Sequence, residues 1–326
     1  MTALPVVALL VAGLLVAALL GPWLLRQAAP ALVRVPRLAV ALLGGAVVVW
    51  LGTLLALGPV LAWVISGPAL LPAGAAAVCQ RCLAAANPFS AVVVDTGVPT
   101  AVLVFLPAAA AALLVTGILG GLRRHARRSR DAAALVLDGA VPRTLLGHRV
   151  LVVDDPRPFA LAFPAKHGGV AVSQGALRLL ESDELAAVLA HEGAHLAQRH
   201  HLATSVVASV ARHLRWVPLI AAVEGALGHY LEIAADDQAR RRAGTTALVG
   251  ALLKLGERAS LAGPRPVVGA LHAAGPERIR HLVRPVGGVV GALPALVAAA
   301  HLLILGAVSA AVYLPYVVAG LQGCAV

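Results

Sequence analysis

Residues Glu184 to His201 read ELAAVLAHEGAHLAQRHH and contain the pattern His-Glu-x-x-His, formed by His191, Glu192 and His195. Apolar residues recur at helical spacing before the pattern and no proline interrupts it, so the stretch is predicted to be a helix. Side chains four residues apart project from the same helix face, so the two imidazoles can meet at one point. Two neutral imidazoles suit a Zn²⁺ ion, and Glu192 can take a proton from a water held by that ion. The stretch therefore predicts a zinc site with Glu192 as general base.

A third ligand separates this interpretation from the alternative, which is two surface histidines on an amphipathic helix. In the later segment HYLEIAADD, Glu232 lies among apolar residues, where an unpaired carboxylate would be costly. Glu232 and Asp236 share a helix face. We expect Glu232 to complete a His-His-Glu set that binds one zinc ion per chain. We expect Asp236 to hold a ligand histidine by its other ring nitrogen.

His229 precedes Glu232 by three residues and is a further catalytic candidate. On a helix it would lie on the same side as Glu232, where it could stabilise the oxyanion of a tetrahedral intermediate. The alternative is a histidine that only packs beside the ligand helix. By contrast, His200 and His201 are predicted to point away from the site, because a continuous helix would turn them off the face of His191.

These residues resemble the motifs of the Ste24/HtpX type of membrane metalloprotease and of the related BlaR/MecR type. The resemblance covers approximately residues 140–285 and includes Phe159–Phe163, Gly168–Ser173 and, more weakly, Gly275–Arg280. It implies an α+β zincin-like, or gluzincin-like, zinc endopeptidase domain acting on a protein or peptide substrate. The membrane plan is more similar to the BlaR/MecR type, although the large sensor domain of the antibiotic receptors is missing, so β-lactam sensing is not expected.

Two kinds of substrate follow from the resemblance. BlaR/MecR-like proteases typically cleave a small winged-helix repressor, whereas Ste24/HtpX-like enzymes cleave misfolded or processed membrane proteins. In either case we expect the substrate to lie in extended form along a strand at Gly168–Val172, by β-augmentation. A non-catalytic membrane signalling scaffold is one alternative function. A transporter with an incidental motif is another, although the apolar spans offer it few polar groups.

The composition predicts a membrane protein, because 60% of the residues are hydrophobic and only 13% are charged, with a mean hydropathy of +0.89. We expect four transmembrane helices. They are predicted in Leu4–Leu25, Leu38–Ile65, Gly97–Leu122 and Leu293–Gly320. The first run lacks the basic start of a secretory signal peptide, so it is interpreted as a helix that stays in the membrane.

Arginines orient these spans. Arg26, Arg34 and Arg37 follow the first span, and a basic run at Arg123–Arg130 follows the third. By the positive-inside rule both connections are cytoplasmic and both termini lie outside. The predicted fold is therefore a mainly α membrane protein with the protease domain inserted between helices three and four. Its expected domains are a membrane domain at 1–122, a cytoplasmic zinc protease domain at 123–290, and a last helix with a short outer tail at 291–326.

The net charge of +11 could suggest nucleic acid binding. Much of this charge flanks membrane spans, however, so anionic lipid headgroups of the bilayer are the expected partner and no direct nucleic acid binding is expected. Cys79, Cys82 and Cys324 all fall on the predicted outer side, where two of them are expected to form a disulfide, the pairing being open. His301 lies inside the last span, where it is either functional or bonded to a neighbouring helix.

The segment between the basic run and the motif helix is predicted to contain three strands. They fall around Arg149–Asp155, Phe159–Phe163 and Gly168–Ser173, where β-branched or apolar residues are bounded by turn formers. Ser182 is the expected N-cap of the motif helix. Residues 203–228 are predicted to form an amphipathic helix that lies against the bilayer or packs on the domain.

Overall fold

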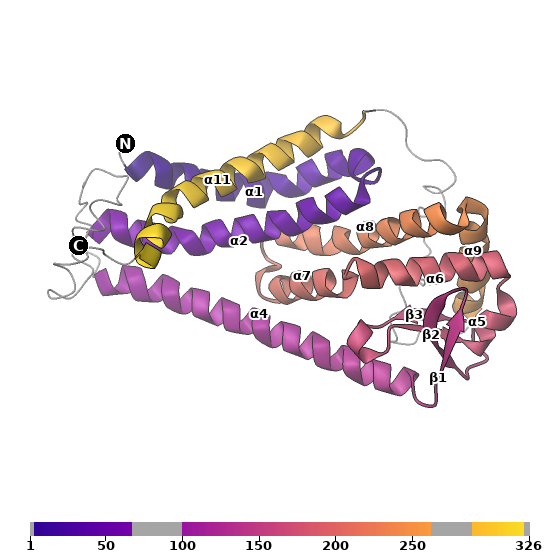
Figure 1. The fold of residues 1–326 in the computed structure, drawn as a ribbon. Helices are drawn as coiled ribbons and strands as arrows, with labels where there is room; N and C mark the ends of the chain where they lie inside the picture. Colours follow the sequence, from indigo (N-terminus) through magenta and orange to yellow (C-terminus); the bar gives the residue numbers. More distant parts are fainter. Residues whose placement is uncertain (1–2, 67–99, 262–288, 323–326) are drawn as a thin grey trace.

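The computed structural model describes residues 3–66, 100–261 and 289–322. Helices α1, α2 and α11 lie at one end of an elongated molecule and the sheet lies at the other, with α4 running between them (Figure 1). The helices are α1 (Ala3–Leu32), α2 (Pro36–Ser66), α4 (Thr100–Val136), α5 (Gln174–Leu179), α6 (Ser182–Ala197), α7 (His200–Leu214), α8 (Pro218–Ala243), α9 (Thr245–Leu261) and α11 (Ala292–Gln322). The strands are β1 (Val141–Leu145), β2 (His148–Val153), β3 (Ala160–Ala162) and β4 (Val170–Ser173).

Three helices of the described residues are long and apolar enough to cross a membrane. Their apolar spans are Pro5–Leu32 in α1, Pro36–Leu55 in α2 and Ala292–Ala311 in α11. Leucines on their outer faces are exposed, as lipid contact requires. The third expected span, Gly97–Leu122, begins outside the described residues and continues as the first part of α4, so its crossing of the membrane stays a prediction.

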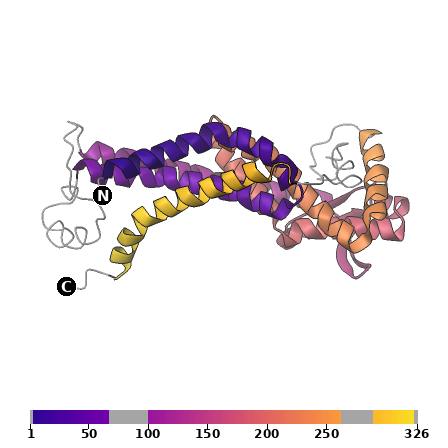
Figure 2. The ribbon, with the colours of Figure 1, turned by 90° about the horizontal axis from the view of Figure 1, so that it is seen from above.

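The three apolar helices pack on one another, as Figure 2 shows from above. Polar side chains within this group find partners on neighbouring helices. The His301 Nε2 lies 3.0 Å from the backbone oxygen of Gly13, and the hydroxyls of Thr53 and Ser309 are 2.8 Å apart. The interpretation of His301 as a residue bonded to a neighbouring helix is therefore confirmed.

Helices α7 and α8 form a hairpin that packs against α1 and α2. Ile220 and Val223 on α8 are fully buried in the same cluster as Leu10 and Leu43 of the membrane helices. The segment 203–228 is thus two helices joined by a turn rather than one, and their apolar faces are covered by the membrane helices. At the far end of α8 the Arg37 guanidinium donates to the Gln238 side chain at 2.6 Å.

The sheet has the strand order β1-β2-β4-β3, so β4 lies inside it. Strand β4 pairs in parallel with β2 and antiparallel with β3. One face packs on α6 and α9, and the other contacts the end of α4 at Ala133. The three predicted strands are confirmed, whereas the exposed strand β1 was not foreseen. The expectation that a substrate adds to Gly168–Val172 is wrong, because both edges of β4 are already paired.

Some expectations fall on parts of the chain outside the described residues. These are the disulfide among Cys79, Cys82 and Cys324 and the weak motif at Gly275–Arg280. The domain limits at 122 and 290 and the orientation in the membrane also stay predictions.

Candidate metal centre

The motif helix α6 begins with a carboxylate-rich turn. The Glu184 carboxylate accepts the backbone N–H of Glu181 at 2.9 Å and binds the Lys254 ammonium of α9 at 2.7 Å. Acidic groups in a first turn stabilise a helix because the exposed N–H groups there carry partial positive charge. The N-cap is Glu181, so the predicted cap, Ser182, is instead the first helical residue.

His191 and His195 on α6 face Glu232 on α8. Their Nε2 atoms are 3.1 Å apart, and each lies 3.5 Å from a carboxylate oxygen of Glu232. Ligands at about 2.0–2.1 Å from a tetrahedral zinc ion stand roughly 3.3 Å from one another. The three donor atoms already form a triangle of that size, and the His-His-Glu composition is one that zinc uses in hydrolases. The zinc ligands predicted from the sequence are confirmed.

Asp236 sits behind His191, one helical turn beyond Glu232 on α8. Its Oδ1 lies 3.0 Å from the Nδ1 of His191, and both side chains are buried. With Nδ1–H donating to Asp236, the Nε2 lone pair of His191 faces His195 and Glu232. This is the arrangement proposed for Asp236 from the sequence.

The electrostatics of His191 reflect these neighbours. Complete burial by itself lowers the pKa of His191, but hydrogen bonds with Asp236 and Glu232 outweigh burial and raise the pKa to about 10. The negative charge of Glu192 acts in the same direction. The carboxylates that favour a proton on His191 also favour a divalent cation in its place.

His200 lies against the second ligand, which the sequence did not indicate. Helix α6 ends at Ala197, and Arg199 adopts a left-handed conformation at φ 52° that starts α7 in a new direction. This turn places His200 Nδ1 2.8 Å from His195 Nδ1. The polar run Gln198–His201, which interrupts the apolar periodicity, was the only signal of a helix break.

The surroundings of His200 favour its neutral form. Burial is the largest cause that lowers the pKa of His200 to about 4, and the positive charge of Arg37 acts in the same direction. A neutral His200 can accept the Nδ1–H of His195 and donate its own Nε2–H to the side chain of Gln198, which is 3.3 Å away. The Nε2 lone pair of His195 is then directed toward the other two ligands.

The two candidate catalytic residues lie in different environments. Glu192 is buried, with 2% of its surface exposed, and directly follows the ligand His191. His229 is exposed on α8, and its ring packs edge-on to Tyr230 with centroids 5.6 Å apart. Catalytic roles for both residues are proposals. The contact with Tyr230 agrees with the alternative in which His229 only packs on its helix.

Comparison with known proteins agrees with this geometry. Residues 123–283 match Peptidase family M48. This segment is similar to that family. The matched segment contains both helices that carry the His191, His195 and Glu232 cluster, so it includes the zinc site.

Curated relatives match this chain over stretches of 75 and 80 residues. A "Protease HtpX homolog" of Thermodesulfovibrio yellowstonii is 35% identical over 75 residues, which are 22% of this chain and 27% of the relative. A protein of the same name from Thermococcus kodakarensis is 40% identical over 80 residues, 24% and 28% of the two chains. The chain thus spans about a quarter of the length of these relatives. No solved structure matches it.

Proposed function

We propose that the protein is an integral membrane zinc endopeptidase that hydrolyses peptide bonds in extended segments of protein substrates. The observation that carries this proposal is the buried triangle of His191, His195 and Glu232, with Glu192 beside it. A zinc ion held there would polarise the scissile carbonyl and lower the pKa of the attacking water.

Different residues of the chain transfer the proton, orient the ligand histidines and bind the oxyanion. Glu192 accepts the proton of the attacking water and passes it to the departing amine. Asp236 and His200 fix the ring orientations of the two ligand histidines through their second nitrogens. If His229 turns toward the site when substrate binds, it donates a hydrogen bond to the oxyanion.

The edge of strand β3 that faces away from β4 is where we expect the substrate backbone to bind. In the antiparallel pairing with β4, the Phe163 N–H donates to Gly169 and the Ser173 N–H donates to Phe159. Backbone groups alternate along such a strand, so those of Ala160 and Ala162 face away from β4. No strand of the described residues pairs with this edge, and β3 contacts the motif helix α6. An extended substrate can therefore add to β3 beside the zinc site.

The membrane setting follows the charge pattern. The basic run Arg123–Arg130 begins the matched segment, and Arg37 at the start of α2 bonds Gln238 within that segment. These basic residues beside the apolar helices support a catalytic domain in the cytoplasm with both termini outside. The protein would then be a multi-pass protein of the cell membrane that cuts on its cytoplasmic side.

The test is made on the purified full-length chain in lipid nanodiscs. We expect about one zinc per chain and cleavage of an unstructured protein, with cleavage lost on chelation and restored by zinc. Zinc without cleavage of any substrate would favour the signalling scaffold, and absence of both would exclude a peptidase.

The substrate class can be tested in the same assay. The relatives found are proteases named HtpX homologs, which favours a Ste24/HtpX-like range of substrates over a dedicated repressor. We expect an unfolded membrane protein to be cut faster than a folded winged-helix repressor. Preferential cleavage of the repressor at a single bond would instead support the BlaR/MecR type.

A further inference from the structure

A cavity of about 330 Å³ lies where α4 meets α7, toward the other end of α7 from His200. The two helices are in close contact there, because a Cβ atom on Gly121 would lie 2.6 Å from the hydroxyl oxygen of Ser209. Ser209 is buried and donates its own hydrogen to the backbone oxygen of Ser205 at 2.7 Å. Closely packed backbone and side-chain atoms of α4 and α7 therefore form one side of the cavity.

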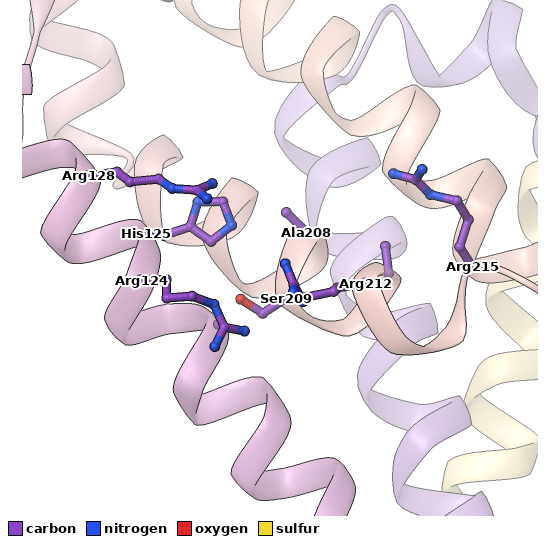
Figure 3. Close-up of a pocket in the computed structure, with 9 residues that line it drawn as sticks. Arg124, His125, Arg128, Ala208, Ser209, Arg212 and Arg215 are labelled. Carbon is purple, nitrogen blue, oxygen red and sulfur yellow. The ribbon is translucent and has the colours of Figure 1, made fainter.

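Positive side chains surround the cavity. Arg124, His125 and Arg128 reach it from α4, and Arg212 and Arg215 reach it from the end of α7 (Figure 3). On α4, Arg124 and Arg128 are one helical turn apart and so lie on the same face. The side chains of Arg124, His125 and Arg128 lie near Ser209 and Arg212 of α7, whereas the Arg215 side chain extends away from them and bonds Glu224.

Most of this charge has no acidic partner among the residues that the structure describes. Arg215 forms two hydrogen bonds with the Glu224 carboxylate, at 2.9 and 2.8 Å. In the described part of the chain no carboxylate lies within 4.0 Å of the guanidinium groups of Arg124, Arg128 or Arg212. Like charges held together in one cavity repel each other, and an anion bound between them removes that repulsion.

The cavity lies at the depth where the protein changes from apolar to basic. On α4 the uncharged run ends at Leu122, directly before the arginines, and Leu113 and Leu119 on the apolar side are exposed. In the turn between α7 and α8, Trp216 follows Arg215 and is 77% exposed. Exposed tryptophan between apolar and charged surface is typical of the membrane–water interface.

We propose that this cavity binds the phosphate of an anionic phospholipid, with the acyl chains along the exposed apolar surface of α4. Guanidinium groups bind phosphate oxygens through paired, charge-assisted hydrogen bonds, and three of the four arginines here are free of carboxylates of the described residues. Soluble phosphate has the same headgroup chemistry, but the interfacial depth and the adjacent exposed leucines favour a lipid. This site is separate from the zinc centre and does not depend on peptidase activity.

The chain offers a matched control for a test. The cavity variant carries Arg124→Gln, Arg128→Gln and Arg212→Gln. The control variant carries Arg123→Gln, Arg127→Gln and Arg130→Gln, which removes the same charge from arginines outside the cavity lining. Both are made in the full-length protein, and their zinc content and thermal unfolding are compared with wild type to verify the fold.

Binding is measured by native mass spectrometry in detergent micelles. Dioleoyl phosphatidylglycerol, dioleoyl phosphatidylcholine and inorganic phosphate are titrated separately. We expect one phosphatidylglycerol to bind wild type and the control variant in preference to phosphatidylcholine. We expect the cavity variant to bind phosphatidylglycerol at least about tenfold more weakly than the control, because it loses directed hydrogen bonds as well as charge.

Three results would overturn the proposal. Equal weakening in both variants would mean that the basic run attracts anionic lipid diffusely, without a site. Tight binding of inorganic phosphate without phosphatidylglycerol would make the ligand a soluble anion. If the cavity variant unfolds, single Arg128→Gln and Arg127→Gln variants are compared in the same way, and equal lipid binding by these two would also reject the site.

Discussion

At the scale of single residues, the zinc ligands could be predicted because their geometry is local. Four-residue spacings place His191 with His195, and Glu232 with Asp236, on shared helix faces whatever the rest of the fold does. His200 could not be placed in this way. Its position depends on the left-handed turn at Arg199. Arginine has no preference for a positive φ, so the sequence does not predict this turn. Loss of regular helix over two residues thus converts a residue expected to point away into a neighbour of His195.

A residue-scale prediction follows for His200. His200→Ala should weaken zinc binding by about 10- to 100-fold, because His195 loses the partner that fixes its ring. Asparagine at position 200 should restore part of the affinity, since its side-chain oxygen can accept the same hydrogen bond. Zinc affinity is measured by competition with a chelator. His201→Ala serves as control, because His201 is exposed. Equal zinc affinity in the alanine variants at positions 200 and 201 would contradict the role of His200.

At the scale of elements, the sequence located three strands but not their order. Apolar runs bounded by turn formers mark where a strand lies, whereas pairing depends on contacts between distant residues. Strand β4 was expected to bind substrate, yet its four residues are buried between β2 and β3. The available edge belongs to β3, a strand of only three residues. Strand β1 was missed because its residues are mostly exposed and include a proline.

Substitution in β3 tests this edge. Ala162→Pro removes an N–H that faces away from β4, so the sheet should persist while a substrate strand loses one hydrogen bond. We expect slower cleavage of an unstructured protein, by about 5- to 10-fold for a bond worth roughly 1–1.5 kcal/mol, with zinc content unchanged. Ala162→Gly keeps the N–H and controls for the loss of the side chain. If the proline and glycine variants cleave at the same rate, the substrate does not pair with β3.

At the scale of the whole molecule, the segment that matches Peptidase family M48 shares a hydrophobic cluster with the membrane helices. Ile220, Val223 and Leu227 of α8 are buried in that cluster together with residues of α1 and α2. Composition and charge predicted several spans and a basic boundary. They could not show that the helix hairpin α7–α8 packs on α1 and α2, because an apolar surface has the same composition whether lipid or protein covers it.

This packing predicts the behaviour of an isolated domain. A fragment of residues 123–290 would expose the valine, leucine and isoleucine side chains of α8 that the membrane helices cover. Each such side chain contributes about 1.5–3 kcal/mol when fully buried. We expect the fragment to aggregate, or to bind zinc weakly, whereas co-expression with residues 1–66 should improve both properties. Size-exclusion chromatography and zinc content provide the readout. A soluble, monomeric fragment with full zinc content would show that the membrane helices are not needed to complete the fold.

The central claim is that one buried site both holds zinc and activates water, with separate residues for each task. The most direct measurement compares zinc content and peptide-bond cleavage in Glu192→Gln and Glu232→Ala of the full-length protein. We predict that Glu192→Gln keeps about one zinc per chain and loses cleavage by at least about 100-fold, as expected for removal of a general base. Glu232→Ala should lose the zinc itself. Cleavage at the wild-type rate by Glu192→Gln, or full zinc occupancy in Glu232→Ala, would contradict this account.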